Sequence, residues 1–144
     1  PVQHPTDAAV ANGDYKFRLV EPEAMKARLG EVSIKNWLEC VDTALDKSGK
    51  NRDGTAYTRD DIDFFNMSLV KPSGHREMLE HLGLTEEQSV YMSSIGHIGE
   101  QDAIINIEAG IEQGRLKPGD TMAIIAAGIG YIWGGAIVEW GPLA

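Results

Sequence analysis

The residues best suited to chemistry fall in two places, a polar loop around His97 and a glycine turn at Gly128–Gly130. His97 follows a short apolar run and precedes a helical pattern, with Gly96 and Gly99 on either side. An imidazole in such a loop can donate a hydrogen bond, accept a proton or cap the helix. Backbone N–H groups in a glycine turn can stabilise a developing oxyanion, although a plain connection between two strands explains the same pattern.

Other polar residues give weaker signals. Asn66 and Ser68 are polar residues near the end of the apolar run 62–69, and His75 and His81 lie in the helical pattern that follows. Each of these two histidines also fits a solvated or partly packed surface position. Cys40 lies in a helical pattern with no base or cation pattern around it, which favours a small buried residue over a reactive thiol. The chain has no Cys/His cluster with zinc spacing, no P-loop and no GxSxG, so we expect neither a metal nor a nucleophile from these motifs.

Composition narrows the classes of partner. The 144 residues carry a formal net charge of −9, which argues against nucleic acid and anionic membranes as partners. No apolar run has the length of a membrane span, and no secretory signal pattern opens the chain. One cysteine permits no internal disulfide, so a cytoplasmic setting is expected. The chain opens on Pro1 rather than Met, and we expect it to be part of a longer chain.

The elements that must position these residues alternate between helix and strand. We expect residues 1–19 to be a surface segment or linker with a possible short strand at 15–19, and residues 20–144 to form one domain. Helices are predicted from Pro22 to an interruption at Gly30, from Ser33 to Gly49, from Pro72 to Gly83, and after His97 to Gly114. In the last helix, Ala103, Ile104, Ile107 and Ile111 are predicted to share one apolar face. Strands are predicted at 62–69, 88–92, 121–127 and 131–140.

This order predicts a layered α/β domain with a mixed sheet, mostly parallel with an antiparallel final pair, and helices on both faces. Ligands of such sheets bind at the carboxyl ends of the strands. Ser68, His97 and Gly128 each follow or end an apolar run, so we expect them to lie together in one site at this end of the sheet.

Longer motifs resemble a known family. The stretch GRLKPGDTMAIIAAGIGYIWGGAIVEW resembles the C-terminal end of synthase III-type ketoacyl-acyl carrier protein condensing enzymes, in the thiolase superfamily. Residues 61–65 resemble the strand that leads to the family's catalytic histidine, and 95–97 resemble the loop that carries its catalytic asparagine. The resemblance covers roughly residues 20–140 and implies a thiolase-like half.

The resemblance also implies a reaction. An acyl group from acyl-CoA or acyl carrier protein would load onto a cysteine of an N-terminal thiolase-like half, in the same or a separate chain, and a second thioester would then attack it. No cofactor is implied, and the complete enzyme would be a homodimer. Cys40 is not the family's nucleophile.

Carried over by position, the match implies site residues with two departures. The family's histidine falls at or near Ser68, and its asparagine position is filled by His97. His97 would then donate a hydrogen bond to the enolate, and Gly128 and Gly130 would line the oxyanion site. Asn66 and a displaced His75 are further candidates. The departures leave open a non-catalytic structural or regulatory half that pairs with a cysteine-bearing partner. An unrelated α/β binding domain is the third reading.

Overall fold

A computed structural model describes residues 11–12 and 21–141. The chain divides into two units, Pro1–Glu31 and Val32–Ala144, and each is considered by itself. The predicted surface segment 1–19, with its strand at 15–19, lies almost entirely outside the described residues.

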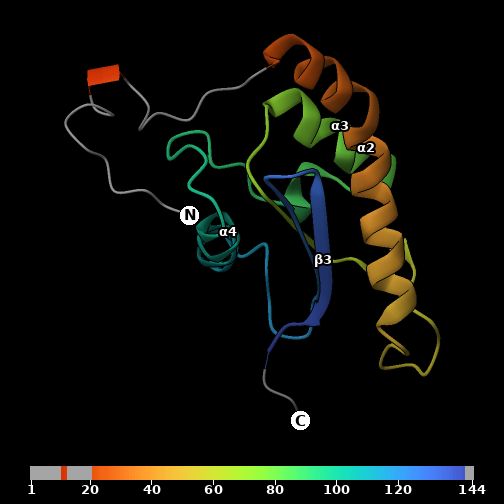
Figure 1. The fold of residues 1–144 in the computed structure, drawn as a ribbon. Helices are drawn as coiled ribbons and strands as arrows, with labels where there is room; N and C mark the ends of the chain where they lie inside the picture. The colour runs from red at the N-terminus through yellow and green to blue at the C-terminus, as the bar shows by residue number, and fades with distance from the viewer. Residues whose placement is uncertain (1–10, 13–20, 142–144) are drawn as a thin grey trace. The chain divides into compact units, whose positions relative to one another are not determined.

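A three-stranded mixed sheet forms the centre of the second unit (Figure 1). Strand β1 (Phe64–Met67) pairs in parallel with β2 (Thr121–Gly128), and β2 pairs antiparallel with β3 (Ile132–Glu139). This confirms the mixed sheet and its antiparallel final pair. All four residues of β1 are buried, as expected for a strand covered on both faces.

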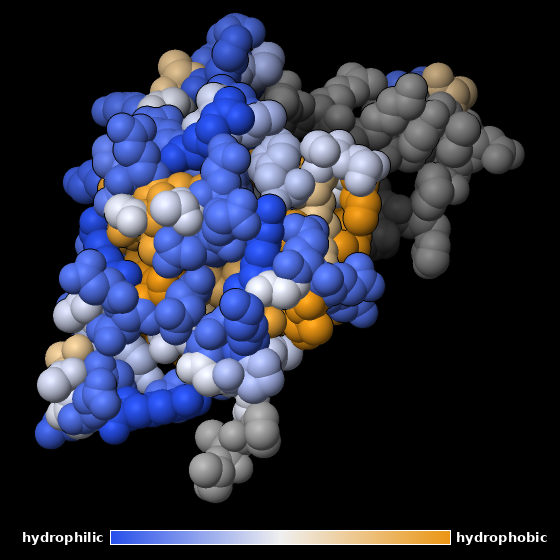
Figure 2. Space-filling model, turned by 180° about the vertical axis from the view of Figure 1, so that it is seen from behind, coloured by the Kyte–Doolittle hydropathy of each residue, from blue (hydrophilic) through white to orange (hydrophobic). Residues whose placement is uncertain are grey.

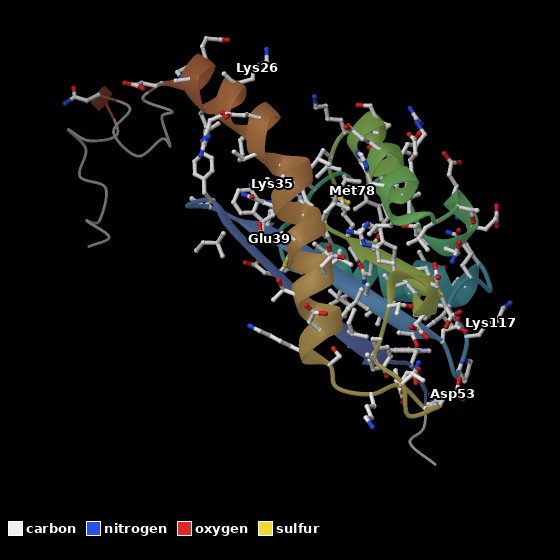
Figure 3. All side chains as sticks on the ribbon, turned by 90° about the vertical axis from the view of Figure 1, so that its right-hand side faces the viewer. Lys26, Lys35, Glu39, Asp53, Met78 and Lys117 are labelled. Atoms are coloured by element: carbon white, nitrogen blue, oxygen red, sulfur yellow. The ribbon has the colours of Figure 1, made fainter. Side chains whose placement is uncertain are left out.

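Helices cover the two faces of the sheet. The part of helix α2 (Pro22–Lys47) that belongs to this unit and helix α3 (Pro72–Leu82) pack on one face, and α4 (Gln101–Glu112) packs on the other (Figure 1). Successive side chains of a strand point to opposite faces of the sheet, so the unit has two hydrophobic cores, one on each face. The first combines Trp37, Val41, Met78, Leu79, Phe65, Met67, Ala123 and Ile125, and the second combines Phe64, Met122, Val90, Met92 and Leu116. Figure 3 shows Met78 of α3 beside α2, in keeping with the first core.

Two predicted boundaries were wrong. Helix α2 is continuous from Pro22 to Lys47, so Gly30 does not interrupt it and Ser33 does not start a new helix. One glycine costs a helix only about 1 kcal/mol, which the packing of Trp37, Val41 and Leu45 outweighs.

The predicted strand at 88–92 is also wrong. The segment makes a single isolated parallel bridge, between Ser89 and Phe65. The Ser89 hydroxyl donates to the carbonyl of Phe65 at 2.7 Å. Val90 and Met92 are buried against Phe64. The hydrophobic pattern therefore predicted the burial of this segment correctly, but its hydrogen bonding as a strand incorrectly.

A polar network closes the end of the sheet where β2 begins. Glu139 accepts hydrogen bonds from the Tyr57 hydroxyl at 2.7 Å and from Arg52 Nε at 3.2 Å. Asp63 accepts from the backbone N–H of Thr121 at 2.9 Å. Asp53 and Lys117 lie in the loops at this end (Figure 3). The opposite end of the sheet, at the carboxyl ends of β1 and β2, carries the exposed Ile129 and is termed the open end.

Candidate functional site

The carboxyl ends of β1 and β2 meet at one end of the sheet because the two strands are parallel. The backbone N–H of Ser68, the residue after β1, donates to the carbonyl of Ile125 at 3.0 Å. Gly128 ends β2 a few residues further along. The turn after β2 and the loop before α4 both lie toward the upper end of the sheet in Figure 1. The topology therefore places the loops of Ser68, His97 and Gly128 toward the same end of the sheet, and a single site formed by all three stays a prediction.

Asp102 joins two of these loops. Its Oδ2 atom lies 2.6 Å from Nδ1 of His97 and accepts a hydrogen bond from the N–H of Leu69 at 2.8 Å. Its Oδ1 atom accepts from the N–H of Ile98 at 2.9 Å. The Asp102 side chain is 1% exposed, whereas that of His97 is 57% exposed. One buried carboxylate thus fixes the ring of an accessible histidine beside the segment that follows β1.

The contacts of Asp102 keep it ionised. Burial pushes its pKa upward, but the hydrogen bonds from Ile98, Leu69 and His97 together outweigh burial and lower the pKa below its ordinary value. Its place in the first turn of α4 also favours the negative charge.

A row of small and polar residues, rather than the predicted apolar face, packs α4 against the sheet. Asp102, Asn106 and Gly110 are the buried residues of this helix, spaced four apart. Of the predicted apolar face, Ile107 packs against the second core, whereas Ile104 is 59% exposed and Ile111 is 48% exposed, so that face is only partly covered. The physical reason is that β1 presents Asn66 to this helix and requires hydrogen-bonding partners from it.

Asn66 supports the helix from within the sheet. It is 1% exposed, and its amide donates to the carbonyl of Ala103 at 2.9 Å. Its Oδ1 accepts from Asn106, which also donates to the carbonyl of Met67, each at 3.0 Å. These contacts place Asn66 between β1 and α4 rather than on an open surface.

His75 lies on α3 and lines a different cavity from the His97 loop. It is 5% exposed and meets Tyr91 edge to face, with ring centroids 5.3 Å apart. The cavity measures about 260 Å³, and Ser89 and Arg115 also line it. The structure therefore does not bring His75 together with His97 through any contact among the described residues.

The glycine turn connects β2 and β3 as a tight hairpin. Gly130 has φ of +98° and Tyr131 has φ of +60°, so the turn requires left-handed backbone at two successive positions. Ile129 at its tip is 98% exposed. The predicted site residues Gly128 and Gly130 thus flank an exposed apolar residue at the open end of the sheet.

Sequence reasoning missed Asp102. Its signal was an acidic residue five positions after His97, in register with Asn106 and Gly110 on one helical row. Hydrophobicity alone favoured the isoleucine row, because it cannot foresee a polar residue on the facing strand.

The buried His75 predicts a pH dependence of stability. Burial lowers its pKa, while Glu86 opposes and Arg76 adds to that shift. Because the folded state binds this proton less readily than the unfolded state, unfolding free energy should fall as pH drops below about 6.5, by at most about 1.4 kcal/mol per pH unit from this group. Urea unfolding between pH 5 and 7 should show that the free energy of unfolding decreases less with falling pH for His75→Gln than for wild type. The matched change His81→Gln, at an exposed position of the same helix, should leave the fall unchanged.

A model of the 3-oxoacyl-[acyl-carrier-protein] synthase III C-terminal family matches residues 53–140, more than half of the chain. The chain belongs to this family. The match runs from the loop before β1 to the end of β3 and includes every candidate residue above.

Curated and solved relatives agree with the family. β-Ketoacyl-[acyl-carrier-protein] synthase III of Staphylococcus haemolyticus is 30% identical over 83 residues, covering 57% of this chain and 26% of the relative. The solved synthase III of Pseudomonas aeruginosa superposes with a TM-score of 0.70 at 19% identity, covering 89% of this chain and 37% of that one. The Aquifex aeolicus enzyme gives 0.69 at 19% identity, covering 80% and 35%. The chain thus spans about a quarter of the length of the curated relative, and the structural likeness establishes a thiolase-like fold.

Residues 11–12 and 21–141 contain neither a membrane-spanning helix nor a metal site. No helix in these ranges combines the length and apolarity that a bilayer crossing requires. No group of three or more His, Cys, Asp or Glu side chains in the same ranges is arranged to hold a metal ion.

Proposed function

We propose that this chain is the C-terminal domain of a synthase III-like acyltransferase that acts on acyl-CoA or acyl carrier protein thioesters. The observation that carries the proposal is the accessible His97 held by Asp102 at the open end of the sheet, within the family match. The nucleophilic cysteine belongs to an N-terminal thiolase-like half, in the same or a separate chain. Gly128 and Gly130 offer backbone N–H groups to the acyl oxyanion.

The state of Cys40 supports an external nucleophile. Burial raises the pKa of its thiol, which disfavours the reactive thiolate. Its Sγ atom would lie 3.2 Å from a Cβ placed on Gly135 of β3, so the thiol faces the sheet between α2 and β3. Cys40 therefore suits packing rather than acyl loading.

Exposed apolar residues support pairing with another half. Large hydrophobic side chains are exposed in the His97 loop, on α4 and in the β2–β3 hairpin, at Ile95, Ile98, Ile104, Ile111, Ile129, Tyr131 and Ile132. The rear view in Figure 2 shows hydrophobic areas among mostly hydrophilic residues. Contiguous exposed apolar surface is typical of interaction sites. A thiolase-like half that covers this surface would also enclose the loop of His97.

The test is to mix the complete protein, including any co-purifying chain, with a panel of acyl-CoAs and to measure intact mass. We expect an acyl-sized increase on a cysteine outside these 144 residues. A mass increase on Cys40, abolished by Cys40→Ser, would contradict the proposed division of labour.

A second function, a non-catalytic half that pairs with a cysteine-bearing partner, is favoured by one observation. Ser68 stands where the family resemblance implies a histidine, and a hydroxyl cannot replace an imidazole as a base at neutral pH. The same experiment separates the two functions, because a non-catalytic pair would give no adduct from any donor.

A further inference from the structure

We infer that His97 acts as a base toward an acyl acceptor that carries an O–H or N–H group, an alcohol or an amine, with Asp102 as its positioning residue. This inference rests on the proposed acyl transfer and names the class of acceptor. It differs from the enolate-donor role that the family resemblance implies for position 97.

The tautomer of His97 follows from the partners of Asp102. Both carboxylate oxygens already accept backbone N–H groups, from Ile98 and from Leu69. An ionised carboxylate offers only acceptors, so the 2.6 Å contact requires His97 Nδ1 to be the donor. A neutral imidazole with hydrogen on Nδ1 has a bare Nε2, which is a proton acceptor.

Exposure places that acceptor within reach of a ligand. The His97 side chain is 57% exposed, and Asp102 occupies its Nδ1 side, so Nε2 is the ring nitrogen left for a substrate. Gly96 and Gly99, with φ of +82° and +83°, carry the loop through backbone turns on both sides of the ring. The loop is further fixed by the Ile98 N–H bond to Asp102, which limits rotation of the histidine away from the site.

The reaction balances with an acyl thioester and an alcohol or amine. Nε2 of His97 takes the proton from the acceptor as its oxygen or nitrogen bonds to the acyl carbon. The carbon–sulfur bond then breaks, and the proton passes from His97 to the departing thiolate. The products are an ester or amide and a free thiol. Asp102 orients the ring throughout and balances the imidazolium charge.

Donation of a hydrogen bond to an enolate would require hydrogen on Nε2 of His97, whereas a base requires that nitrogen to be bare. The enolate oxygen needs an N–H, and the neutral ring fixed by Asp102 has none at Nε2. An asparagine amide can donate such a hydrogen bond at any pH, but it cannot act as a base. The two roles therefore predict opposite results for an amide substitution at position 97.

The test follows the acyl-enzyme of the complete protein after loading with acyl-CoA. Intact mass would give the rate of acyl loss to water and to added n-butanol, and separately to malonyl-CoA. We expect His97→Gln to slow loss to water and n-butanol by about 10²- to 10⁴-fold, the usual contribution of a positioned base. Asp102→Asn should slow the same steps and shift their pH profile. His81→Gln, at an exposed histidine outside the site, should match wild type.

The outcomes are distinct. Acyl transfer to water and n-butanol that survives in His97→Gln would overturn the inference, as would a wild-type acyl-enzyme that reacts with malonyl-CoA but with neither O–H acceptor. Failure to load any acyl group would instead contradict the proposed function.

A second measurement needs no acyl-enzyme. Nitrogen-15 NMR of the histidines should show neutral His97 with hydrogen on Nδ1, and Asp102→Asn should change that tautomer. Hydrogen on Nε2 in the wild-type neutral ring would overturn the inference directly. Because Gln at position 97 keeps an exposed polar side chain, that variant remains informative even where Asp102→Asn fails to fold.

Discussion

Asp102→Ala is expected to lower the free energy of unfolding by about 1–3 kcal/mol, because two partly buried backbone N–H groups lose their acceptor. The carboxylate accepts from Leu69 and Ile98, and its side chain is 1% exposed. Alanine fits the helix but supplies no acceptor; a fully buried orphaned donor costs about 1–3 kcal/mol, and contact with water reduces that cost for Leu69 and Ile98. Urea unfolding of the complete protein, followed by far-UV circular dichroism, would measure the change.

The matched control is Glu108→Ala, an exposed acid on the same helix, which should change unfolding free energy by less than about 0.5 kcal/mol. Equal effects of the two substitutions would mean that Asp102 does not hold the two loops together. The direction of a pH dependence of stability also follows from the pKa of Asp102, which is lower in the folded state. The stabilisation by Asp102 is present above its unfolded pKa of about 3.9 and is lost as pH falls through the lower folded value.

Gly110→Ala is expected to lower the free energy of unfolding by about 1–3 kcal/mol, although alanine is normally the better helix former. A Cβ at this position would lie 2.7 Å from Cζ and 3.0 Å from Cε2 of Phe64, and 3.3 Å from Cβ of Leu116. Phe64 is fully buried in the sheet, so its ring has little room to move. The overpacking penalty should therefore exceed the helix-propensity gain of up to about 1 kcal/mol.

Two further variants isolate the cause. Gly134→Ala in β3, where no atom lies within 4 Å of an added Cβ, should be neutral or stabilising. Phe64→Leu should reduce the penalty of Gly110→Ala in a double-mutant cycle, since the ring atoms that clash are removed. Additive effects of Phe64→Leu and Gly110→Ala would show that the Phe64 ring does not restrict this helix.

The contacts of α4 connect the fold to the proposed chemistry. Asn106 and Gly110 hold the helix close to β1, which places Asp102 at the carboxyl end of that strand. Asp102 then bridges the segment after β1 and the loop of His97. The position of the histidine thus depends on a helix that packs through polar and small residues.

Much of this arrangement could be predicted from local sequence. Pro72 and Gly83 bounded α3 correctly, since proline suits a first helical turn and Gly83 adopts φ of +73° after the last. The apolar runs around β1, β2 and β3 predicted the strands, and the glycine turn at Gly128–Gly130 predicted the connection between β2 and β3. Motif order indicated the family, which the match over residues 53–140 confirms.

The parts that failed depend on contacts between distant segments. Residues 88–92 look like a strand, but whether they form a ladder depends on backbone pairing with β1, and Ser89 makes only one bridge there. The continuity of α2 through Gly30 and the exposure of Ile104 and Ile111 on α4 could not be predicted from neighbouring residues alone.

The sequence by itself determined the alternation of helix and strand, the family and the candidate position of His97, because these depend on periodicity, turn residues and local motifs. Only the tertiary structure decided that Asp102 is the partner of His97 and that Ile104 and Ile111 face outward. The physical reason is that a buried polar group on one segment, here Asn66 of β1, selects which row of a distant helix packs against it. Sequence spacing lists the rows of α4, but hydrogen bonding across the helix–sheet contact chooses between them.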